Sequence, residues 1–485
     1  MYYRGATHVY RVNAPGAGLI AMPKQQKSIP GQARASGPSV LDTLSADSIA
    51  PPDPLLDSQY EFLGDGDIPF ERYTSQSYFQ REVRELWSRS WQWACREEHL
   101  PDVGDTYTYD IGPYSIIVVR SKPDTIQAFL NSCTHRGTRI LGGQGSGYGA
   151  LFTCPFHGWS WELDGSIRNI PGRWDFPHVC NETHDLQAVN CELWGGFVFI
   201  NIDLAAKPLA SYLDIMPQHF KHFPLERRRI KLHVQKTLPA NWKAAQEAFM
   251  EAYHNFETHD SPNGGNTQYD VFGKYVSRFI HNIGNYSPES LQDYPGDKWR
   301  RPPLTEDEQL AFLSVFNLEY GAVPEGSSAR EIAAQKLREH FGESLGIDFS
   351  EVSESLMLDS IEYHLFPNMF FFAGINVPMV YRFRPNGEDV ESSIFDLCIL
   401  EPLPEGEPHP EPPEPHFLDV EQSYTEVKEL GWLAPVYDED TGNLDLQQKG
   451  FKTSRKTGLT LGNYQEARIR RVHLTLDEFL PETGE

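Results

Sequence analysis

The sequence is poor in cysteine and has no long apolar run. Only six of the 485 residues are cysteine, which are too few and too scattered for a disulfide framework. No apolar stretch approaches the roughly 20 residues that a membrane-spanning helix needs. The N-terminus also lacks the apolar segment of a signal peptide. These absences exclude a disulfide-rich secreted domain, and we expect a cytoplasmic protein that does not bind a membrane.

Basic residues are scarce relative to acidic ones. The chain has 42 Lys and Arg against 68 Asp and Glu, which gives a formal net charge of −26 at pH 7. Binding to nucleic acid needs a basic surface that neutralises phosphates, so we exclude a nucleic-acid partner. A glycine-rich turn for a dinucleotide or a flavin, set between a strand and a helix, is missing as well. Any reaction that draws on NAD(P)H therefore needs a separate protein.

Four metal-binding side chains stand out against this background. Cys133 and His135 form a C-x-H pair, Cys154 and His157 form a C-x-x-H pair, and a glycine follows each pair. A structural zinc site more often takes C-x-x-C and H-x-H pairs from separate elements. In a Rieske [2Fe–2S] centre, two cysteines bind one iron and two histidines bind the other. A zinc knuckle is the alternative interpretation of these residues.

The length of the chain and the order of its patterns predict two or more domains. Residues 1–55, with scattered Gly, Pro, Ser and Gln, predict a flexible arm that is either disordered or laid over a neighbouring subunit. Residues 56–92 form a helical part, with an aromatic stripe of helical spacing from Thr74 to about Cys95. The β-rich segments around the four metal-binding residues predict a small all-β domain at 93–203.

A second group of candidate ligands follows a good helix N-cap, Asn241. His254 and His259 are five residues apart, so an ideal helix would point them about 140° apart. The helix must therefore end or bulge between them if both are to bind one metal. Glu251 stands three residues before His254 and is expected on its face of the helix. Taken alone, this spacing is a weak signal, and core packing explains it equally well.

The C-terminal third is rich in apolar runs and ends near an acidic stretch. From residue 360 onward, runs of apolar residues are typical of central strands in an antiparallel sheet. Asp438, Glu439 and Asp440 form a run of acids of the kind that is usually a solvated turn. However, two histidines alone do not make a catalytic iron site. A 2-His-1-carboxylate triad binds Fe(II) on one face and leaves positions open for O2.

From about residue 60 to its end, the chain resembles the Rieske non-haem iron oxygenases, and among them the large or alpha terminal subunits of aromatic ring-hydroxylating dioxygenases. The resemblance rests on the two Cys/His loops and on residues 241–259, which read Asn-Trp-Lys, then an acid, then Tyr-His-x4-His. It implies an α+β fold. The all-β Rieske domain is inserted into a catalytic domain, at 204–485, whose antiparallel sheet is flanked by helices in a helix-grip arrangement.

The resemblance also implies a set of site residues. The Rieske cluster would be bound by Cys133, His135, Cys154 and His157. A mononuclear Fe(II) would be bound by His254, His259 and Asp440. The family pattern D-x-x-N selects Asp440, and Asp438 is the alternative. Glu251 would bridge iron ligand His254 and cluster ligand His157 of the next subunit; otherwise it is an ordinary surface acid paired with a lysine.

We expect an apolar substrate pocket, because ligand sites are usually walled by apolar side chains with few polar groups. Four side chains are available for it: Phe249, Met250, Phe256 and Phe279. Two positions depart from the commoner family pattern. Many members have Asp at the position of Glu251 and Asn at the position of Ala248.

The implied function is that of a terminal oxygenase. Electrons from the Rieske cluster would activate O2 at the mononuclear iron, and a hydrophobic, aromatic substrate would be hydroxylated. An NAD(P)H-dependent reductase, with or without a ferredoxin, would supply the electrons. The assembly would be a homotrimer or an alpha3beta3 complex with a small subunit. The alternatives are a Rieske monooxygenase or demethylase for a non-aromatic or quaternary-amine substrate, and a pure electron carrier.

Overall fold

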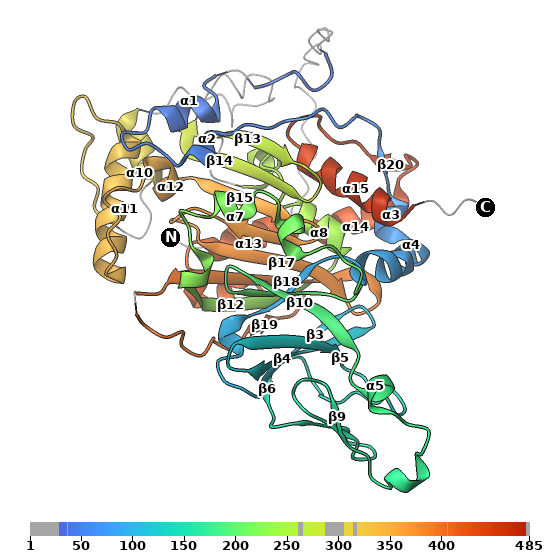
Figure 1. Cartoon of the computed structure of the whole chain (residues 1–485). Helices are drawn as coiled ribbons and strands as arrows, with labels where there is room; N and C mark the ends of the chain where they lie inside the picture. The colour runs from blue at the N-terminus through green and yellow to red at the C-terminus, as the bar shows by residue number, and fades with distance from the viewer. Residues whose placement is uncertain are drawn as a thin grey trace.

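The computed structural model of the chain describes residues 29–35, 37–259, 265–286, 305–313, 318–404 and 406–481. They form a large lobe built on an antiparallel sheet and a small all-β lobe that projects from it (Figure 1). The predicted α+β fold is therefore confirmed.

The large lobe is organised around an eight-stranded sheet. Its neighbouring strands are antiparallel except for β19, which lies parallel to β12 at one edge. The spatial order is β13 (Gly265–Phe272), β14 (Val276–Tyr286), β15 (Ser360–Leu365), β16 (Met369–Phe372), β17 (Met379–Asn386), β18 (Asp389–Pro402), β12 (Arg228–Leu238) and β19 (His416–Leu418). The apolar runs after residue 360 become strands β15 to β17, which are buried on both faces as such runs predict.

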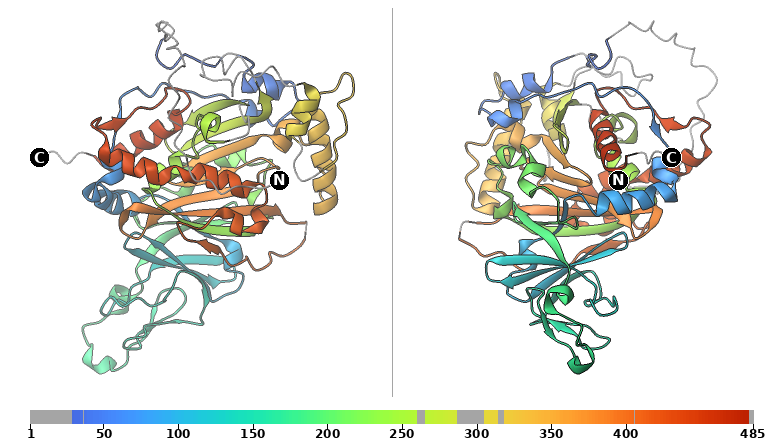
Figure 2. Two further views of the ribbon diagram at one scale, coloured as in Figure 1. Left: turned by 180° about the vertical axis from the view of Figure 1, so that it is seen from behind. Right: turned by 45° about the vertical axis from the view of Figure 1, so that its right-hand side comes forward.

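Two groups of helices cover this sheet (Figures 1 and 2). The first group comprises α8 (Trp242–Glu247), α9 (Asn255–Thr258), α13 (Leu433–Gly442), α14 (Leu444–Thr453) and α15 (Ala467–Phe479). Of these helices, α8 packs on β17 and β18, α15 packs on β13, and α14 packs on α8. The second group lies at the β14 end of the sheet: α10 (Glu306–Leu313), α11 (Ala329–Leu345) and α12 (Glu354–Leu358). Among the described helices, none combines the length and apolar character that crossing a bilayer requires.

The small lobe holds two sheets. The larger has the order β2 (Gln92–Arg96), β11 (Phe197–Asn201), β10 (Ala188–Trp194), β5 (Thr125–Leu130), β4 (Tyr114–Lys122), β3 (Asp105–Ile111) and β6 (Gly145–Tyr148). The smaller consists of β7 (Phe152–Thr153), β8 (Ser160–Trp161) and β9 (Ile167–Asn169), with α5 (Asn181–His184) nearby. The first Cys/His loop follows β5, and the second joins β7 to β8.

Buried arginines connect the two lobes through hydrogen bonds to main-chain oxygens. Arg96, on β2 of the small lobe, is almost fully buried and donates to the main-chain oxygens of Leu225 and Arg228. Arg382, on β17 of the large sheet, donates to the main-chain oxygen of Ala94 and pairs with Asp396. The small lobe is thus fixed to the sheet by charged side chains that already have partners.

Two helical stretches, the predicted helix from Thr74 to about Cys95 and an amphipathic stretch from Pro208 to Phe223, are broken in the structure. The helix expected from Thr74 to Cys95 consists of α3 (Glu71–Thr74), α4 (Gln76–Arg81) and a π-helical turn at Glu82–Trp87. Its last residues instead form strand β2, because they pair with β11. The amphipathic stretch after Pro208 divides into α6 (Leu209–Leu213) and α7 (Met216–His219) at Asp214, whose φ is +50°.

The N-terminal arm is more ordered than expected. Helices α1 (Val40–Ser45) and α2 (Asp53–Leu56) pack on the same chain, and a short pairing of β1 (Ile68–Pro69) with β20 (Gly458–Leu459) follows. Ser48 Oγ donates to Glu354 at 2.7 Å, and Asp47 accepts the main-chain N–H of Ser355. The prediction of a flexible arm over 1–55 is therefore wrong for its second half, while residues 1–28 and 36 lie outside the described residues.

Candidate functional site

Three predicted ligands meet between α9 and α13. His254 Nε2 lies 3.3 Å and His259 Nε2 lies 3.1 Å from the same oxygen of Asp440, Oδ1. The ligand atoms of the three side chains all lie within 4.8 Å of one another. Two imidazoles and one carboxylate that converge in this way are the donor set that suits a mononuclear iron.

The main chain can bring the two histidines together because helix α8 ends before it reaches them. We expected the helix from Asn241 to continue past Glu251, but α8 ends at Glu247, and α9 starts only at Asn255. Side chains bind the main chain between the two helices. Glu251 Oε2 accepts the N–H groups of Tyr253 and His254, and Arg468 donates to the main-chain oxygen of Met250 at 2.9 Å. These bonds replace the helical ones and bring the two histidines together.

Each histidine has a further carboxylate behind it. Glu251 Oε1 lies 2.8 Å from His254 Nδ1, and Glu439 Oε2 lies 2.7 Å from His259 Nδ1. A carboxylate on Nδ1 keeps the proton on that nitrogen and leaves Nε2 free to bind a metal. Our sequence analysis missed the role of Glu439. Its position next to Asp440 was the only signal, and a run of acids carries little information.

The structure separates the two candidate aspartates. Both lie on helix α13, which the acidic run forms in place of a turn. Asp438 points away from the histidines, where it accepts hydrogen bonds from Ser423 Oγ and from the main-chain N–H of Tyr424. Asp440 lies two residues later and faces them.

The ionised carboxylate of Asp440 and the protonated imidazole of His254 stabilise each other. Burial opposes the ionised form of Asp440, but its bonds to His254 and His259 lower the pKa of this carboxyl below its usual range. Burial also opposes protonation of His254, yet Asp440 and Glu251 together raise the pKa of this imidazole to about 10. The site therefore attracts positive charge strongly, which a divalent cation would satisfy.

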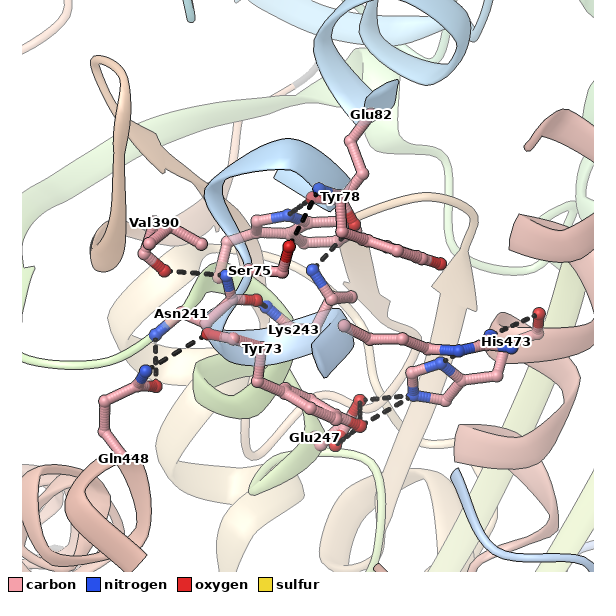
Figure 3. Close-up of polar contacts among 12 residues, drawn as sticks. Tyr73, Ser75, Tyr78, Glu82, Asn241, Lys243, Glu247, Val390, Gln448 and His473 are labelled. Carbon is pink, nitrogen blue, oxygen red and sulfur yellow. Dashed lines mark hydrogen bonds and ion pairs between the residues drawn. The ribbon is translucent and has the colours of Figure 1, made fainter. Parts of the chain in front are cut away.

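A buried polar network anchors α8, the helix that leads to the triad (Figure 3). Glu247, at the end of α8, accepts from the hydroxyl of Tyr73 at 2.9 Å and lies 2.9 Å from His473 Nε2. Near the start of α8, Lys243 binds Glu82 at 2.6 Å, and both side chains are fully buried. The helix is thus held between the N-terminal segment and α15.

A cavity of about 390 Å³ opens beside the triad. Besides His254, His259 and Asp440, its wall includes Ala248, Phe249, Phe279, Leu358, Phe372, Val377, Met379, Tyr381, Trp432 and Tyr437. Phe249 and Phe279 thus lie where we expected. Met250 does not line the cavity, because its side chain turns into the hydrophobic core when the helix ends. The side chain of Phe256 lies outside what the structure describes.

The two Cys/His loops have matching turns at the outer part of the small lobe. Gly137 N–H donates to Cys133 O at 2.8 Å, and Gly158 N–H donates to Cys154 O at 3.1 Å. Both glycines have positive φ, 77° and 73°, which other residues adopt only with strain. Each turn brings one cysteine and one histidine to the same side. The imidazole rings of His135 and His157 lie 4.8 Å apart.

These four side chains fit a two-iron cluster better than a single zinc. Both cysteines are buried, and Nδ1 of His135 is buried without a hydrogen-bond partner. One tetrahedral zinc would hold its ligand atoms roughly 3.5 Å apart. Within the described ranges, only the His254, His259 and Asp440 group brings three ligand atoms of this kind so near to one another. A larger group with two metals suits the two-thiol, two-imidazole donor set.

Comparison with known proteins agrees with this geometry. The family model of the Rieske [2Fe-2S] domain matches residues 90–179. The model of the ring hydroxylating alpha subunit (catalytic domain) matches residues 225–482, more than half of the chain. Together the two family models imply a Rieske [2Fe–2S] cluster and a mononuclear iron.

Curated relatives include oxygenase subunits for different substrates. The carnitine monooxygenase oxygenase subunit of Escherichia coli is 30% identical over 216 residues, which are 44% of this chain and 56% of that protein. The biphenyl 2,3-dioxygenase subunit alpha of Rhodococcus jostii is 33% identical over 189 residues, 38% of this chain and 41% of that protein. The chain thus spans about half the length of the curated relatives it matches.

Solved structures share the fold at low identity. A quaternary ammonium Rieske monooxygenase in complex with L-carnitine has a TM-score of 0.58 at 18% identity, covering 85% of this chain and 95% of that one. A naphthalene 1,2-dioxygenase variant bound to phenanthrene has a TM-score of 0.60 at 16% identity, covering 88% and 94%. The matched family models and this fold lead to one conclusion: the chain belongs to the family of Rieske ring-hydroxylating oxygenase alpha subunits.

Proposed function

We propose that the protein is the terminal oxygenase component of a Rieske oxygenase system and that it hydroxylates a hydrophobic organic substrate. The observation that carries this proposal is the triad of His254, His259 and Asp440, whose ligand atoms converge on one wall of an apolar cavity. A protein that only carried electrons would need neither the convergence of these side chains nor a cavity beside them.

The proposed metal ligands fall into two sets. Cys133 and Cys154 would hold one iron of the Rieske cluster, while His135 and His157 would hold the other. His254, His259 and Asp440 would hold the mononuclear iron, which supplies O2 activation when bound.

The side chains around the mononuclear site have separate tasks. Glu251 and Glu439 keep the imidazoles of His254 and His259 oriented, with the proton on Nδ1. The cavity wall excludes water and holds a substrate next to the triad. Phe249 and Phe279 contribute aromatic faces to this wall, which suits an apolar substrate.

The electron path would cross a subunit boundary. Within one chain, the two Cys/His loops belong to the projecting lobe, whereas α8 and α13 belong to the large lobe (Figure 1). A ring of three chains, each contacting the next head to tail, would bring the cluster of one subunit to the iron of its neighbour. Glu251, which already binds His254, would then reach His157 of the neighbouring chain. An NAD(P)H-dependent reductase, with or without a ferredoxin, would supply the electrons.

The relatives favour two substrate classes. The apolar and aromatic lining of the cavity supports a hydrophobic, aromatic substrate, as the name biphenyl 2,3-dioxygenase describes for one relative. The carnitine monooxygenase relatives favour the second candidate, monooxygenation or demethylation of a quaternary amine.

One experiment tests the oxygenase proposal and separates these classes. The purified protein should contain about three irons per chain, two in the cluster and one in the triad. When it is supplied with a reductase and 18O2, it should transfer labelled oxygen to a member of a panel of aromatic and quaternary-amine compounds. Two irons per chain and no labelled product across the panel would point to an electron carrier instead.

A further inference from the structure

A buried ion pair forms part of the cavity wall beyond the iron ligands. Glu362 lies on β15 and lines the cavity, and it is only 1% exposed. Arg468, on α15, donates from Nη2 to Glu362 Oε1 at 2.7 Å. Neither residue has a part in the proposed binding of the metals. A carboxylate in a largely apolar ligand cavity calls for a specific explanation, because burying a charge is costly unless every part of it is satisfied.

All three guanidinium nitrogens of Arg468 donate hydrogen bonds to other parts of the chain. Its Nη1 donates to the main-chain oxygen of Met250 at 2.9 Å, and its Nε donates to Ser277 Oγ at 3.2 Å. Its guanidinium also lies 4.9 Å from the ring centroid of Phe279. The arginine therefore positions Glu362 and helps to hold the segment that leads to the iron ligands.

Only one of the two carboxylate oxygens of Glu362 has a hydrogen-bond partner in the described part of the chain. Every hydrogen bond that it makes to the described part of the chain goes to Oε1, so Oε2 has no partner there. Among the other polar groups of the cavity lining, Asn376 Oδ1 also lacks a hydrogen-bond partner, but this atom is shielded from the cavity surface. The hydroxyls of Tyr381 and Tyr437 bind each other, and Tyr437 also contacts Met379 Sδ. Burial raises the pKa of Glu362 to about 7 against the opposing effect of Arg468, so the carboxyl is mostly ionised at pH 8.

We propose that Glu362 is a specificity-determining residue, and that the substrate is an apolar molecule carrying an uncharged O–H or N–H donor that binds Glu362 Oε2. This inference rests on the proposed function and narrows its substrate class. A pure hydrocarbon would shield Glu362 Oε2 from water without giving it a hydrogen bond. A substrate with an O–H or N–H group would donate one to this oxygen. The donor would meet the wall at Glu362 while the apolar body of the molecule extends towards the iron ligands.

The same geometry disfavours a quaternary ammonium group at this wall. The positive charge of Arg468, 2.7 Å from Glu362 Oε1, offsets much of the attraction that the carboxylate would exert on a cation. A quaternary nitrogen also has no N–H to donate, so the free oxygen would remain without a hydrogen bond.

Binding of two matched probes to the oxidised holoenzyme tests the inference. Biphenyl and 4-hydroxybiphenyl differ by one hydroxyl, and their dissociation constants can be measured by calorimetry at pH 8 without turnover. We expect 4-hydroxybiphenyl to bind about tenfold more tightly or better, because hydrogen bonds to charged groups are the stronger ones. Equal affinity, or tighter binding of biphenyl, would overturn the inference without any variant being made.

Two variants test whether Glu362 causes the preference for 4-hydroxybiphenyl over biphenyl. Glu362→Gln keeps the shape of the side chain and should reduce the preference for 4-hydroxybiphenyl by about threefold or more, since a neutral partner makes a weaker bond. Val436→Ala removes apolar wall and should weaken both probes alike. An unchanged preference in Glu362→Gln, with the cluster spectrum retained to show that it is folded, would contradict the assignment.

A third probe separates charge from hydrogen bonding. If γ-butyrobetaine binds more tightly than 4-hydroxybiphenyl and loses affinity in Glu362→Gln, the wall recognises a cation and the inference is wrong. Iron content and labelled product are measured on the same preparation. A protein with three irons that oxygenates a panel compound but lacks the hydroxyl preference refutes only this inference, whereas a protein without the third iron refutes the proposed function.

Discussion

Glu439 Oε2 lies 2.7 Å from His259 Nδ1, in the same way that Glu251 Oε1 lies 2.8 Å from His254 Nδ1. Both imidazoles of the triad therefore have a carboxylate on one nitrogen and Asp440 near the other. The two acids differ in their surroundings. The side chain of Glu251 is 10% exposed and that of Glu439 is 36% exposed, so water competes more strongly for the second.

The first prediction concerns Glu439. Glu439→Gln should weaken Fe(II) binding by roughly tenfold, the lower end of the effect seen for such outer carboxylates, because Glu439 is partly exposed. Titration of the iron-depleted protein with Fe(II) measures this. Asp445→Asn, which changes an exposed acid on the next helix, is the matched control and should bind iron as the parent does. Equal affinity of Glu439→Gln and the parent would show that Glu439 does not orient His259.

The second prediction separates the two aspartates. Asp440→Ala should leave the cluster spectrum intact, lose the third iron and abolish activity, because it removes the anionic ligand of the triad. Asp438→Ala should keep the iron and lose only some stability, since Asp438 binds Ser423 and Tyr424. Metal analysis of both variants decides the matter. The reverse pattern would mean that the ligand is Asp438.

The third prediction concerns the cluster. His157→Ala and His135→Ala should each abolish the visible spectrum of a Rieske centre and leave iron bound at the triad, because each removes a ligand of the same iron. His178→Ala changes an exposed histidine near these loops and should leave the spectrum unchanged. A normal spectrum in both ligand variants would rule out the cluster assignment.

The fourth prediction concerns electron transfer through Glu251. With Fe(II) in excess, Glu251→Gln should hold both metal centres, because Glu251 ligates neither metal, and should slow the oxidation of a pre-reduced cluster in a single turnover with substrate and O2. Glu251→Asp should recover part of the rate if the boundary closes up. Glu257→Gln, an exposed acid on α9, serves as the control. If Glu251→Gln loses its cluster electron as fast as the parent, Glu251 is not the bridge.

The fifth prediction is a pH dependence of stability. Burial opposes ionisation of Asp396, but Arg382 and Arg384 hold the pKa of this carboxyl well below its usual 3.8. The folded state thus binds this proton less readily than the unfolded state, so the stabilisation is present above about pH 4 and is lost as the pH falls further. Asp396→Asn should cost about 3–5 kcal/mol at pH 7, because it leaves buried arginines unpaired.

Urea unfolding between pH 7 and pH 3 measures this effect. Glu401→Gln is the control, since Glu401 binds the more exposed Arg229 and Lys231 on the neighbouring strand β12. This change should cost about 1 kcal/mol or less. Comparable losses in the two variants would contradict the assigned role of Asp396.

Much of the fold and part of the site could be predicted from local patterns in the sequence. The Cys/His loops are short motifs, so their ligand set can be read from nearby residues. The spacing of His254 and His259 was a weak signal by itself, and the family resemblance was needed to assign these histidines and Asp440 to one site. The strands after residue 360 were predictable because a buried strand needs a continuous apolar run. The α+β class followed from the order of these segments and from the family resemblance.

Other features depend on contacts between distant residues. The helix before the triad ends at Glu247 because Glu251 and Arg468 bind the main chain that follows, and no propensity predicts such a bond. Met250 turns into the core for the same reason. Glu362 and Arg468 meet across 106 positions of sequence, so neither residue stands out until the sheet and α15 are in place.

The network around α8 also sets an order of assembly during synthesis. Tyr73 contacts His473 across 400 positions, and Glu247 of α8 binds both. Helix α15 must therefore have been synthesised before these contacts can hold the helix that leads to His254 and His259. The two loops at Cys133 and Cys154, by contrast, are complete within the first 160 residues. The contacts around α8 thus link early and late parts of the sequence, whereas the two cluster loops lie close together in it.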